Sequence, residues 1–337
     1  MARPSKIRTA KAAGLTAVAL LLTSCVHNAP QDALKPKGTV SRELNNLFWP
    51  VFWIAVGVFV LVGGLILIAI IKFRERSEDE APVQVHGNTR LELTWTLIPF
   101  LLLAGIAIPT VKTVFDINRI PKDGMVVEAT GHRWWWQFSY PDQHFSTANE
   151  LHIPTGQKIV IHLTSVDVIH NFWPPELAGK LYAIPGRTNR MVIEADQPAT
   201  YYGQCAEYCG TSHANMRFRV IAQTPNDFET WVAQQRQGPA TVDPTLADAL
   251  AGQQLFGQTG CAGCHTVQGI SAGIVGPDLT HLQSRSVFAG SIFAMNPNNL
   301  RAWLRNPPSE KPGADMPNLH LTEDQITKLI AYLETLK

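Results

Sequence analysis

Cysteine is scarce in this sequence, and the few cysteines are not distributed like a disulfide framework. The 337 residues contain five cysteines, one alone at position 25 and two close pairs at 205 and 209 and at 261 and 264. This pattern argues against a small disulfide-stabilised domain. An excess of one charge is also missing, because 28 basic residues balance 27 acidic ones and no long Lys/Arg-rich run occurs. Nucleic acid is therefore not expected as a partner.

Residues 1–24 are expected to form a secretory signal peptide. A basic start precedes a short apolar run at 15–22, and the small residues Thr23 and Ser24 lead directly into Cys25. This junction resembles a bacterial lipobox, in which cleavage leaves the cysteine as a new, lipidated N-terminus; the alternative is an ordinary cleavage site beside an incidental cysteine. Both interpretations place the mature N-terminus outside the cytoplasm.

Two apolar segments follow, and their length is typical of membrane-spanning helices. Residues 47–71 carry no charge, and at about 1.5 Å per residue they suffice to cross a hydrocarbon core of roughly 30 Å. A second apolar segment at 93–111 follows a loop with four basic residues, Lys72, Arg74, Arg76 and Arg90. Basic loops stay in the cytoplasm, so the chain after Phe115 is expected outside it. A buried helical pair in a soluble protein is the alternative.

The remainder divides into a β-rich and a helical part. Short β-branched and aromatic runs separated by turn residues between 125 and 222 predict an all-β sandwich or barrel. Helical patterns recur at 246–256, 298–305 and 322–336, and the last opens with a capping box at Thr322. The expected division is a signal peptide (1–24), an extracytoplasmic segment (25–45), a first transmembrane helix (46–72), a cytoplasmic loop (73–91), a second transmembrane helix (92–115), an all-β domain (120–224), a helix with a Gly/Pro-rich linker (225–245) and an all-α domain (246–337).

The densest chemistry lies in the loop 205–216, which contains two thiols, an imidazole and a thioether. Soft sulfur combined with imidazole suits copper. A mononuclear blue-copper site takes a single cysteine, whereas here Cys209 accompanies Cys205, and two thiolates can bridge two copper ions. Each copper then needs its own imidazole, for which His213 and the upstream His170 are available. The competing interpretation is a disulfide, a surface histidine and a core methionine, Met216.

The second motif is Cys261-Ala262-Gly263-Cys264-His265, a C-x-x-C-H site for thioether attachment of haem c with His265 as the proximal ligand. A thioredoxin-like pair or a zinc half-site would need a βαβ context or a second ligand pair, and the sequence supplies neither. A methionine is expected at the other axial position. Met316 follows a Pro/Gly-rich loop and is favoured, whereas Met295 lies in an apolar stretch that suits packing.

At this point the sequence resembles a known family. The loop 205–216 and His170 are similar to the CuA domain of cytochrome c oxidase subunit II over about 40–225, and residues 246–337 resemble a class I cytochrome c, as in caa-type haem-copper oxidases. The resemblance implies a cupredoxin-like sandwich and assigns the CuA ligands as the bridging Cys205 and Cys209, one imidazole per copper from His170 and His213, the weak ligand Met216 and the Glu207 carbonyl. By the same analogy the Glu207 carboxylate reaches a magnesium ion at the interface with subunit I.

Three further positions take their expected roles from the resemblance. In the aromatic segment 131–140, Trp134 occupies the place where electrons enter, although the three tryptophans could instead pack in the core or at the membrane interface. Glu92 matches the glutamate at the mouth of the cytoplasmic proton channel, or it is an acid snorkelling at a helix end. Tyr182 stands where family members commonly place an acid, so a strongly acidic docking face is not expected.

The resemblance implies a subunit of a proton-translocating cytochrome c oxidase in the bacterial inner membrane, with both soluble domains on the periplasmic side. Electrons would pass from haem c to CuA and on to subunit I, where dioxygen is reduced, so no catalytic acid, base or nucleophile is expected in this chain. Subunits I and III and a donor cytochrome or upstream respiratory complex are the expected partners. The alternatives are a copper chaperone, a quinol oxidase subunit II, whose branch lacks the copper ligands, and a nitrous oxide reductase-like CuA carrier, which should lack the membrane helices.

Overall fold

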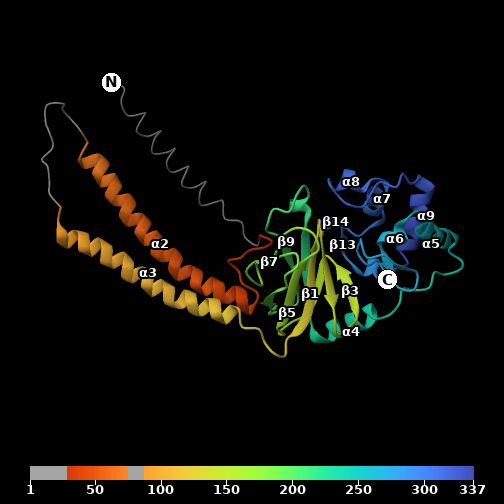
Figure 1. Cartoon of the computed structure of the whole chain (residues 1–337), viewed down its shortest axis with the longest axis horizontal. Helices are drawn as coiled ribbons and strands as arrows, with labels where there is room; N and C mark the ends of the chain where they lie inside the picture. Colours follow the sequence, from red (N-terminus) through yellow and green to blue (C-terminus); the bar gives the residue numbers. More distant parts are fainter. Residues whose placement is uncertain (1–28, 75–86) are drawn as a thin grey trace, which may run out of the picture.

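The computed structural model describes residues 29–74 and 87–337, arranged as a helical hairpin, a β-sandwich and a helical C-terminal domain (Figure 1). The hairpin projects from one end of the sandwich, and the C-terminal domain lies on the other side of it. The expected order of a two-helix hairpin, a sandwich and a helical domain is thereby confirmed. The expected signal peptide, Cys25 and most of the cytoplasmic loop lie outside the described residues.

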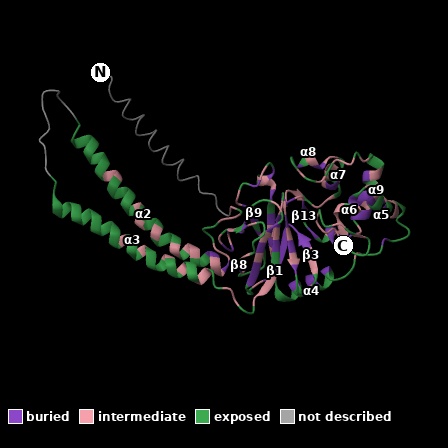
Figure 2. Ribbon diagram, viewed as in Figure 1, coloured by how far each residue is buried: buried purple, intermediate pink, exposed green. Residues whose placement is uncertain are grey.

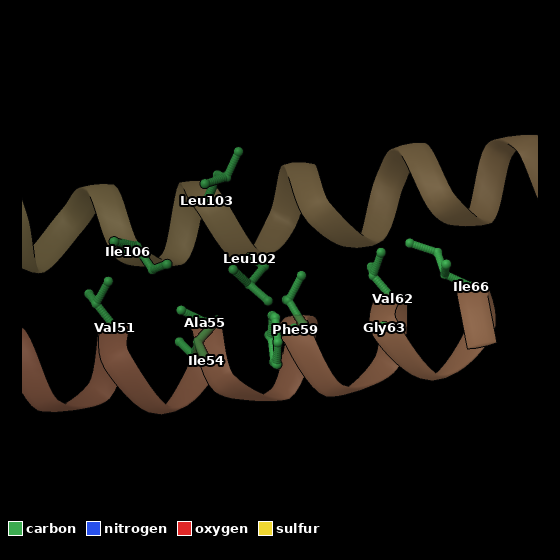
Figure 3. Close-up of a pocket in the computed structure, with 11 residues that line it drawn as sticks. Val51, Ile54, Ala55, Phe59, Val62, Gly63, Ile66, Leu102, Leu103 and Ile106 are labelled. Carbon is green, nitrogen blue, oxygen red and sulfur yellow. The ribbon is translucent and has the colours of Figure 1, made fainter. Parts of the chain in front are cut away.

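The hairpin consists of α2 (Thr39–Lys72) and α3 (Thr89–Ile117). Both helices are apolar enough to cross a membrane, with hydropathies of 3.1 and 1.9 in their most apolar windows, and neither window is buried in the chain (Figure 2). Figure 3 shows apolar side chains of both helices, among them Val51, Phe59 and Leu102, lining a groove of about 530 Å³. The apolar surface of the hairpin is therefore left for lipid or another subunit.

Helix α2 begins at Thr39, earlier than the expected 46, because its first turn packs on the sandwich. Ser41 Oγ donates to the Glu176 carbonyl at 2.7 Å, and Arg42 forms two hydrogen bonds with Asp196 at 2.8 and 3.0 Å. Gly38, just before the helix, lies so close to the Glu194 backbone that a Cβ would stand 2.1 Å from its carbonyl oxygen. Contacts outside the apolar pattern therefore determine where this helix starts.

Two five-stranded sheets face each other in the sandwich, in the orders β3-β2-β1-β5-β8 and β4-β10-β9-β6-β7. The strands are β1 (Met125–His132), β2 (Trp135–Tyr140), β3 (Phe145–Ala148), β4 (Glu150–Pro154), β5 (Ile159–Ser165), β6 (His170–Trp173), β7 (Leu181–Ala183), β8 (Asn189–Ile193), β9 (Ala199–Cys205) and β10 (Arg217–Gln223). Alternate residues of these strands point inward. The aromatic centre of the core contains Trp136, Phe172 and Phe218, with the two phenylalanine rings stacked 4.2 Å apart.

After α4 (Pro225–Gln235), the C-terminal domain contains α5 (Ala247–Gln258), α6 (Cys261–Cys264), α7 (Pro297–Arg305), α8 (Pro307–Glu310) and α9 (Glu323–Leu333). Gly252 allows α5 to pack tightly on α9, since a Cβ there would lie 2.0 Å from the Lys328 carbonyl oxygen. The capping box expected at the last helix is present: the Thr322 hydroxyl accepts from the Gln325 amide at 3.3 Å, and the Gln325 side chain accepts from Thr322 N at 2.9 Å.

The C-terminal domain also contains two short β-ladders that the helical pattern did not predict. They pair β11 (Thr266–Val267) with β12 (Ser271–Ala272) and β13 (Val287–Phe288) with β14 (Phe293–Ala294). Strands of two residues are too short to produce a recognisable alternation. The turn joining β13 to β14 contains three consecutive residues with positive φ, Ala289, Gly290 and Ser291.

The linker between the domains lies along the C-terminal domain. Val242 is buried in that domain's core, and the Gln237 carbonyl is bonded to His281 Nε2 at 2.9 Å. Direct contacts also join the two soluble domains, as the hydrogen bond from Arg217 N in β10 to the Gly290 carbonyl at 3.0 Å shows.

Candidate metal centre and haem-binding segment

The sheet register brings the two distant parts of the predicted copper site to one end of the sandwich. Strand β6 begins at His170 and pairs antiparallel with β9, which ends at Cys205, so that Phe172 lies opposite Cys205. The loop that follows returns through the short helix η1 (His213–Asn215) to β10. Gly131 on β1 allows the His170 ring to approach, since a Cβ there would lie 2.6 Å from the ring carbon Cδ2.

All six predicted copper ligands lie together, around the two cysteine sulfurs. These Sγ atoms are 3.8 Å apart and form no disulfide, which contradicts the disulfide interpretation. Cys205 Sγ is 3.9 Å from His170 Nδ1 and 3.2 Å from the Glu207 carbonyl oxygen, and Cys209 Sγ is 3.5 Å from His213 Nδ1 and 3.8 Å from Met216 Sδ. Two soft thiolates between two imidazoles form the donor set that a pair of copper ions requires.

Burial and hydrogen bonding set the protonation of the two thiols as a pair. Cys205 and Cys209 are both buried in the chain. A hydrogen bond from the Cys209 thiol, opposed by burial and assisted by His170, lowers the pKa of Cys205 to about 4. The same interaction, together with burial, raises the pKa of Cys209. The pair therefore retains a proton between the sulfurs that metal binding must displace.

Asp167 orients the buried imidazole of His170. Its Oδ1 is 2.7 Å from His170 Nε2, so that Nδ1 faces Cys205. Burial alone raises the pKa of Asp167, but hydrogen bonds from His170, Val168 N and Arg133 N outweigh it and lower the pKa to about 2. The sequence motif contained this aspartate, but its function became visible only with the geometry. A carboxylate behind a ligating histidine fixes the ring tautomer and orientation.

The three consecutive tryptophans occupy three different environments. Trp134 is 7% exposed, and its indole Nε1 donates to the Cys209 carbonyl at 3.0 Å. Trp135 stacks on His132 with the ring centroids 4.1 Å apart, and Trp136 is fully buried between the sheets. Among the three, Trp134 is the one hydrogen-bonded to the loop 205–216, the copper loop.

The C-x-x-C-H motif forms α6, immediately followed by His265. Nδ1 of His265 is bonded to the Pro277 carbonyl at 2.8 Å, which fixes the tautomer and leaves Nε2 for a metal. Burial lowers the pKa of His265 and so favours the neutral, ligating ring. Gly276 packs against this ring, because a Cβ there would lie 2.5 Å from Cε1.

The surroundings of this motif fit a haem. Arg285 is buried, and its Nε has no hydrogen-bond partner in the structure, so a haem propionate would satisfy it. Met316 is half-buried in the domain core, with its Sδ 3.2 Å from the indole Nε1 of Trp303. Met295 packs against the same core, so burial does not distinguish the two methionines.

The remaining predicted positions lie apart from this centre. Glu92 is exposed in the first turn of α3, at the end of the hairpin distant from the sandwich (Figure 1). Tyr182 is 44% exposed on β7, beside the strand that carries His170. Within the described parts of the chain, the cluster of histidine, cysteine and acidic ligands consists of His170, Cys205 and Cys209. The Glu207 carboxylate belongs to no such cluster among these described residues.

Comparisons with known proteins agree with this arrangement. Family models match at residues 24–113 (cytochrome c oxidase subunit II, transmembrane domain), 143–223 (its periplasmic domain) and 249–337 (cytochrome c). The cytochrome c oxidase subunit 2 of Alkalihalophilus pseudofirmus is 39% identical over 332 residues, which are 96% of each chain. The quinol oxidase subunit 2 of Bacillus anthracis is 33% identical over 234 residues, covering 67% of this chain and 80% of the relative.

Among solved structures, the periplasmic domain of cytochrome oxidase subunit II from Bradyrhizobium japonicum is 32% identical, with a TM-score of 0.34. The match covers 35% of this chain and 97% of that one.

Proposed function

Because the chain belongs to the cytochrome c oxidase subunit II family, we propose that it transfers electrons from a haem c in its C-terminal domain to a CuA centre in its sandwich. When bound, the two groups supply one-electron redox couples. The observation that carries the proposal is the convergence of two imidazoles, a thioether and a backbone carbonyl on two cysteine sulfurs 3.8 Å apart. Dioxygen reduction and proton translocation take place in subunit I, so this chain contributes no catalytic acid or base.

The proposed copper ligands are Cys205 and Cys209 as bridges, His170 and His213 as terminal ligands, and Met216 and the Glu207 carbonyl as weak ligands. Each imidazole presents Nδ1 to a sulfur, and Met216 is fully buried. The Glu207 carbonyl oxygen lies 3.2 Å from Cys205 Sγ. The Glu207 carboxylate would bind magnesium only if subunit I supplied the other ligands.

The proposed haem is attached through Cys261 and Cys264 and ligated by His265 and Met316. The bond from His265 to Pro277 O supports the proximal role, because it directs Nε2 away from the backbone. Met316 is chosen over Met295 because it lies on the loop before the last helix, where class I cytochromes c carry their distal methionine. Trp134 is the proposed place of electron arrival at CuA, since it is hydrogen-bonded to the Cys209 carbonyl.

Membrane location follows from the family and the two long apolar helices. We assign the protein to the bacterial inner membrane, crossed twice, with both soluble domains in the periplasm. The apolar groove between α2 and α3 is available to subunit I (Figure 3). Subunit III and a donor cytochrome or respiratory complex complete the proposed partners, and Glu92 lies at the cytoplasmic end, where a proton channel would open.

The quinol oxidase relatives define the second candidate function. They match 67% of this chain, and the family resemblance implies that their branch lacks the copper ligands, whereas all six predicted ligands are present here. A C-terminal domain that matches cytochrome c also favours a cytochrome-dependent oxidase.

Metal and haem analysis of the purified membrane complex tests the proposal. Besides the copper of the haem-copper site in subunit I, we expect two coppers and one covalent haem per subunit II, with a mixed-valence dicopper signal in the electron paramagnetic resonance spectrum. The variant Cys209→Ser should abolish that signal, whereas Cys264→Ser should weaken haem attachment and leave the copper signal intact. A wild-type complex without the dicopper signal, or with fewer than two coppers beyond that of subunit I, would contradict the assignment.

A further inference from the structure

The C-terminal domain covers Trp134 with a short segment of its own, Lys311-Pro312-Gly313. Gly313 lies so close to the indole that a Cβ would stand 2.8 Å from Cη2 and 2.9 Å from Cζ3 of Trp134, and its φ of +83° suits glycine. Ser212, beside the ligand His213, donates its hydroxyl to the Pro312 carbonyl at 2.5 Å. The segment is therefore bound to the copper loop and lies against the indole.

Lys311 reaches from this segment into the boundary between the two domains. Its side chain is almost completely buried, at 3% exposure. Its ammonium donates to the carbonyl of Trp134 at 2.5 Å and to the carbonyl of Ala289 at 3.0 Å. One acceptor belongs to the sandwich and the other to the C-terminal domain, so a single cation joins the two.

The Lys311 ammonium lies in a narrow space. Gly290 lines it, and a Cβ there would lie 2.7 Å from Lys311 Nζ and 2.8 Å from the Trp134 carbonyl oxygen. Burial lowers the pKa of Lys311 to about 7. A buried ammonium without its acceptors is strongly disfavoured, so the two carbonyls must stay in place for the side chain to remain there.

We propose that Lys311 is a positioning residue that fixes the haem-carrying domain on the copper domain and holds Lys311-Pro312-Gly313 against Trp134. The consequence, a constant distance between electron donor and acceptor, rests on the proposed function. The contact of Lys311 with the two carbonyls does not depend on that function. Two contacts flank the ammonium: Arg217 N donates to the Gly290 carbonyl at 3.0 Å, and further away Ser286 N donates to Glu150 at 3.0 Å.

The test compares Lys311→Met with Lys328→Met in the full complex. Both substitutions remove an ammonium from the same domain, but Lys328 pairs with Asp324 on its own helix α9 at 2.5 Å. Hydrogen exchange at the Arg217 amide reports on the interface beside Lys311, and exchange along α9 reports on the C-terminal core. We expect Lys311→Met to accelerate exchange at Arg217 by about tenfold or more, because losing a charged hydrogen bond allows local opening. Exchange along α9 should not change, and Lys328→Met should leave Arg217 unchanged.

The second readout is the rate at which electrons leave the haem domain for copper after flash reduction. A positioned step loses rate steeply with small displacements, so we expect a fall on the order of tenfold in Lys311→Met, with unchanged haem and copper spectra. The variant Ser212→Ala, which alters only the sandwich side of the contact, should change both readouts in the same direction by a smaller factor.

Three results would overturn the inference: unchanged Arg217 exchange in Lys311→Met, an unchanged interdomain rate, or acceleration along α9 equal to that at Arg217. The last would show that Lys311 merely stabilises its own domain through Ala289. If the wild-type complex lacked the dicopper signal, the proposed function would fail, but exchange at Arg217 would still decide the role of Lys311.

Discussion

Replacing Asp167 should weaken copper binding without removing any ligand. The carboxylate is 2.7 Å from His170 Nε2 and is itself held by backbone amides of Val168 at 2.6 Å and Arg133 at 2.7 Å. His170 is fully buried, and the Asp167 carboxylate separates its Nε2 from solvent. Without the carboxylate, the imidazole is free to adopt the tautomer or ring orientation that turns Nδ1 away from Cys205.

The magnitude depends on what replaces the carboxylate. Removal of a second partner of a ligating histidine typically costs 10–100-fold in metal affinity, about 1.4 to 2.7 kcal/mol. In Asp167→Asn the amide oxygen still accepts from the imidazole, so we expect the lower end, about tenfold. In Asp167→Ala no acceptor remains, and we expect about a hundredfold.

Competition with a copper chelator of known affinity, followed through the dicopper absorption of the purified complex, measures this loss. The matched control is Asp142→Asn, which removes the same charge from an exposed turn of the same domain. Equal affinities for wild type, Asp167→Asn and Asp167→Ala would refute the reasoning. An equal loss in Asp142→Asn would show that net charge, and not the hydrogen bond to His170, was responsible.

Three further predictions concern the haem, the interface and the donor. Met316→Leu should abolish the low-spin six-coordinate haem spectrum, whereas Met295→Leu should leave it intact; the reverse result would reassign the distal ligand. Glu150 is largely buried, which raises its pKa, but the nearby His152 imidazole and hydrogen bonds from Ser286 outweigh burial and leave the pKa lowered. The ionised carboxylate therefore stabilises the fold fully above the unfolded-state pKa of about 4.3, and this stabilisation is lost as the pH falls through the lower folded-state pKa. The melting temperatures of wild type and Glu150→Gln should differ at pH 7 and converge in acid. A difference that stays constant with pH would contradict this. Tyr182→Asp should increase the salt dependence of turnover with an added soluble cytochrome if an acidic docking face is missing here, and no change would remove that idea.

The sequence predicted those features whose signal is local. The helix pairs of the hairpin, the capping box at Thr322 and the C-x-x-C-H site follow from runs of adjacent residues. The pairing of His170 with the loop 205–216 was predictable although they lie far apart in the chain. Two bridging thiolates imply two coppers, and the second copper needs an imidazole from outside the loop. The actual meeting of His170 with the loop depends on the register of β6 and β9.

Features that depend on the orientation of one side chain or on the docking of two domains were not predictable. The role of Asp167 needs the orientation of one imidazole, and the role of Lys311 needs the docking of two domains. Lysine 311 has no distinguishing sequence context, since a lysine in a Pro/Gly-rich loop is ordinarily solvated. The Gly/Pro-rich segment was predicted only as a linker, and composition alone does not reveal that Val242 packs in the C-terminal core.

Because α2 starts early and packs on the β-sandwich, it fixes the distance of the sandwich from the bilayer and its rotation about the helix axis. Ser41 and Arg42 attach the first turn to the sandwich, and the same helix continues without a break to Lys72. An α-helix advances about 1.5 Å and turns about 100° per residue, so one residue inserted after Arg42 would lift the sandwich by that step and rotate it by more than a quarter turn relative to the bilayer-facing side chains. Helix α2 therefore both holds the sandwich at the membrane and fixes its distance from it. The number of residues in the helix determines which side of the metal centre faces a neighbouring subunit.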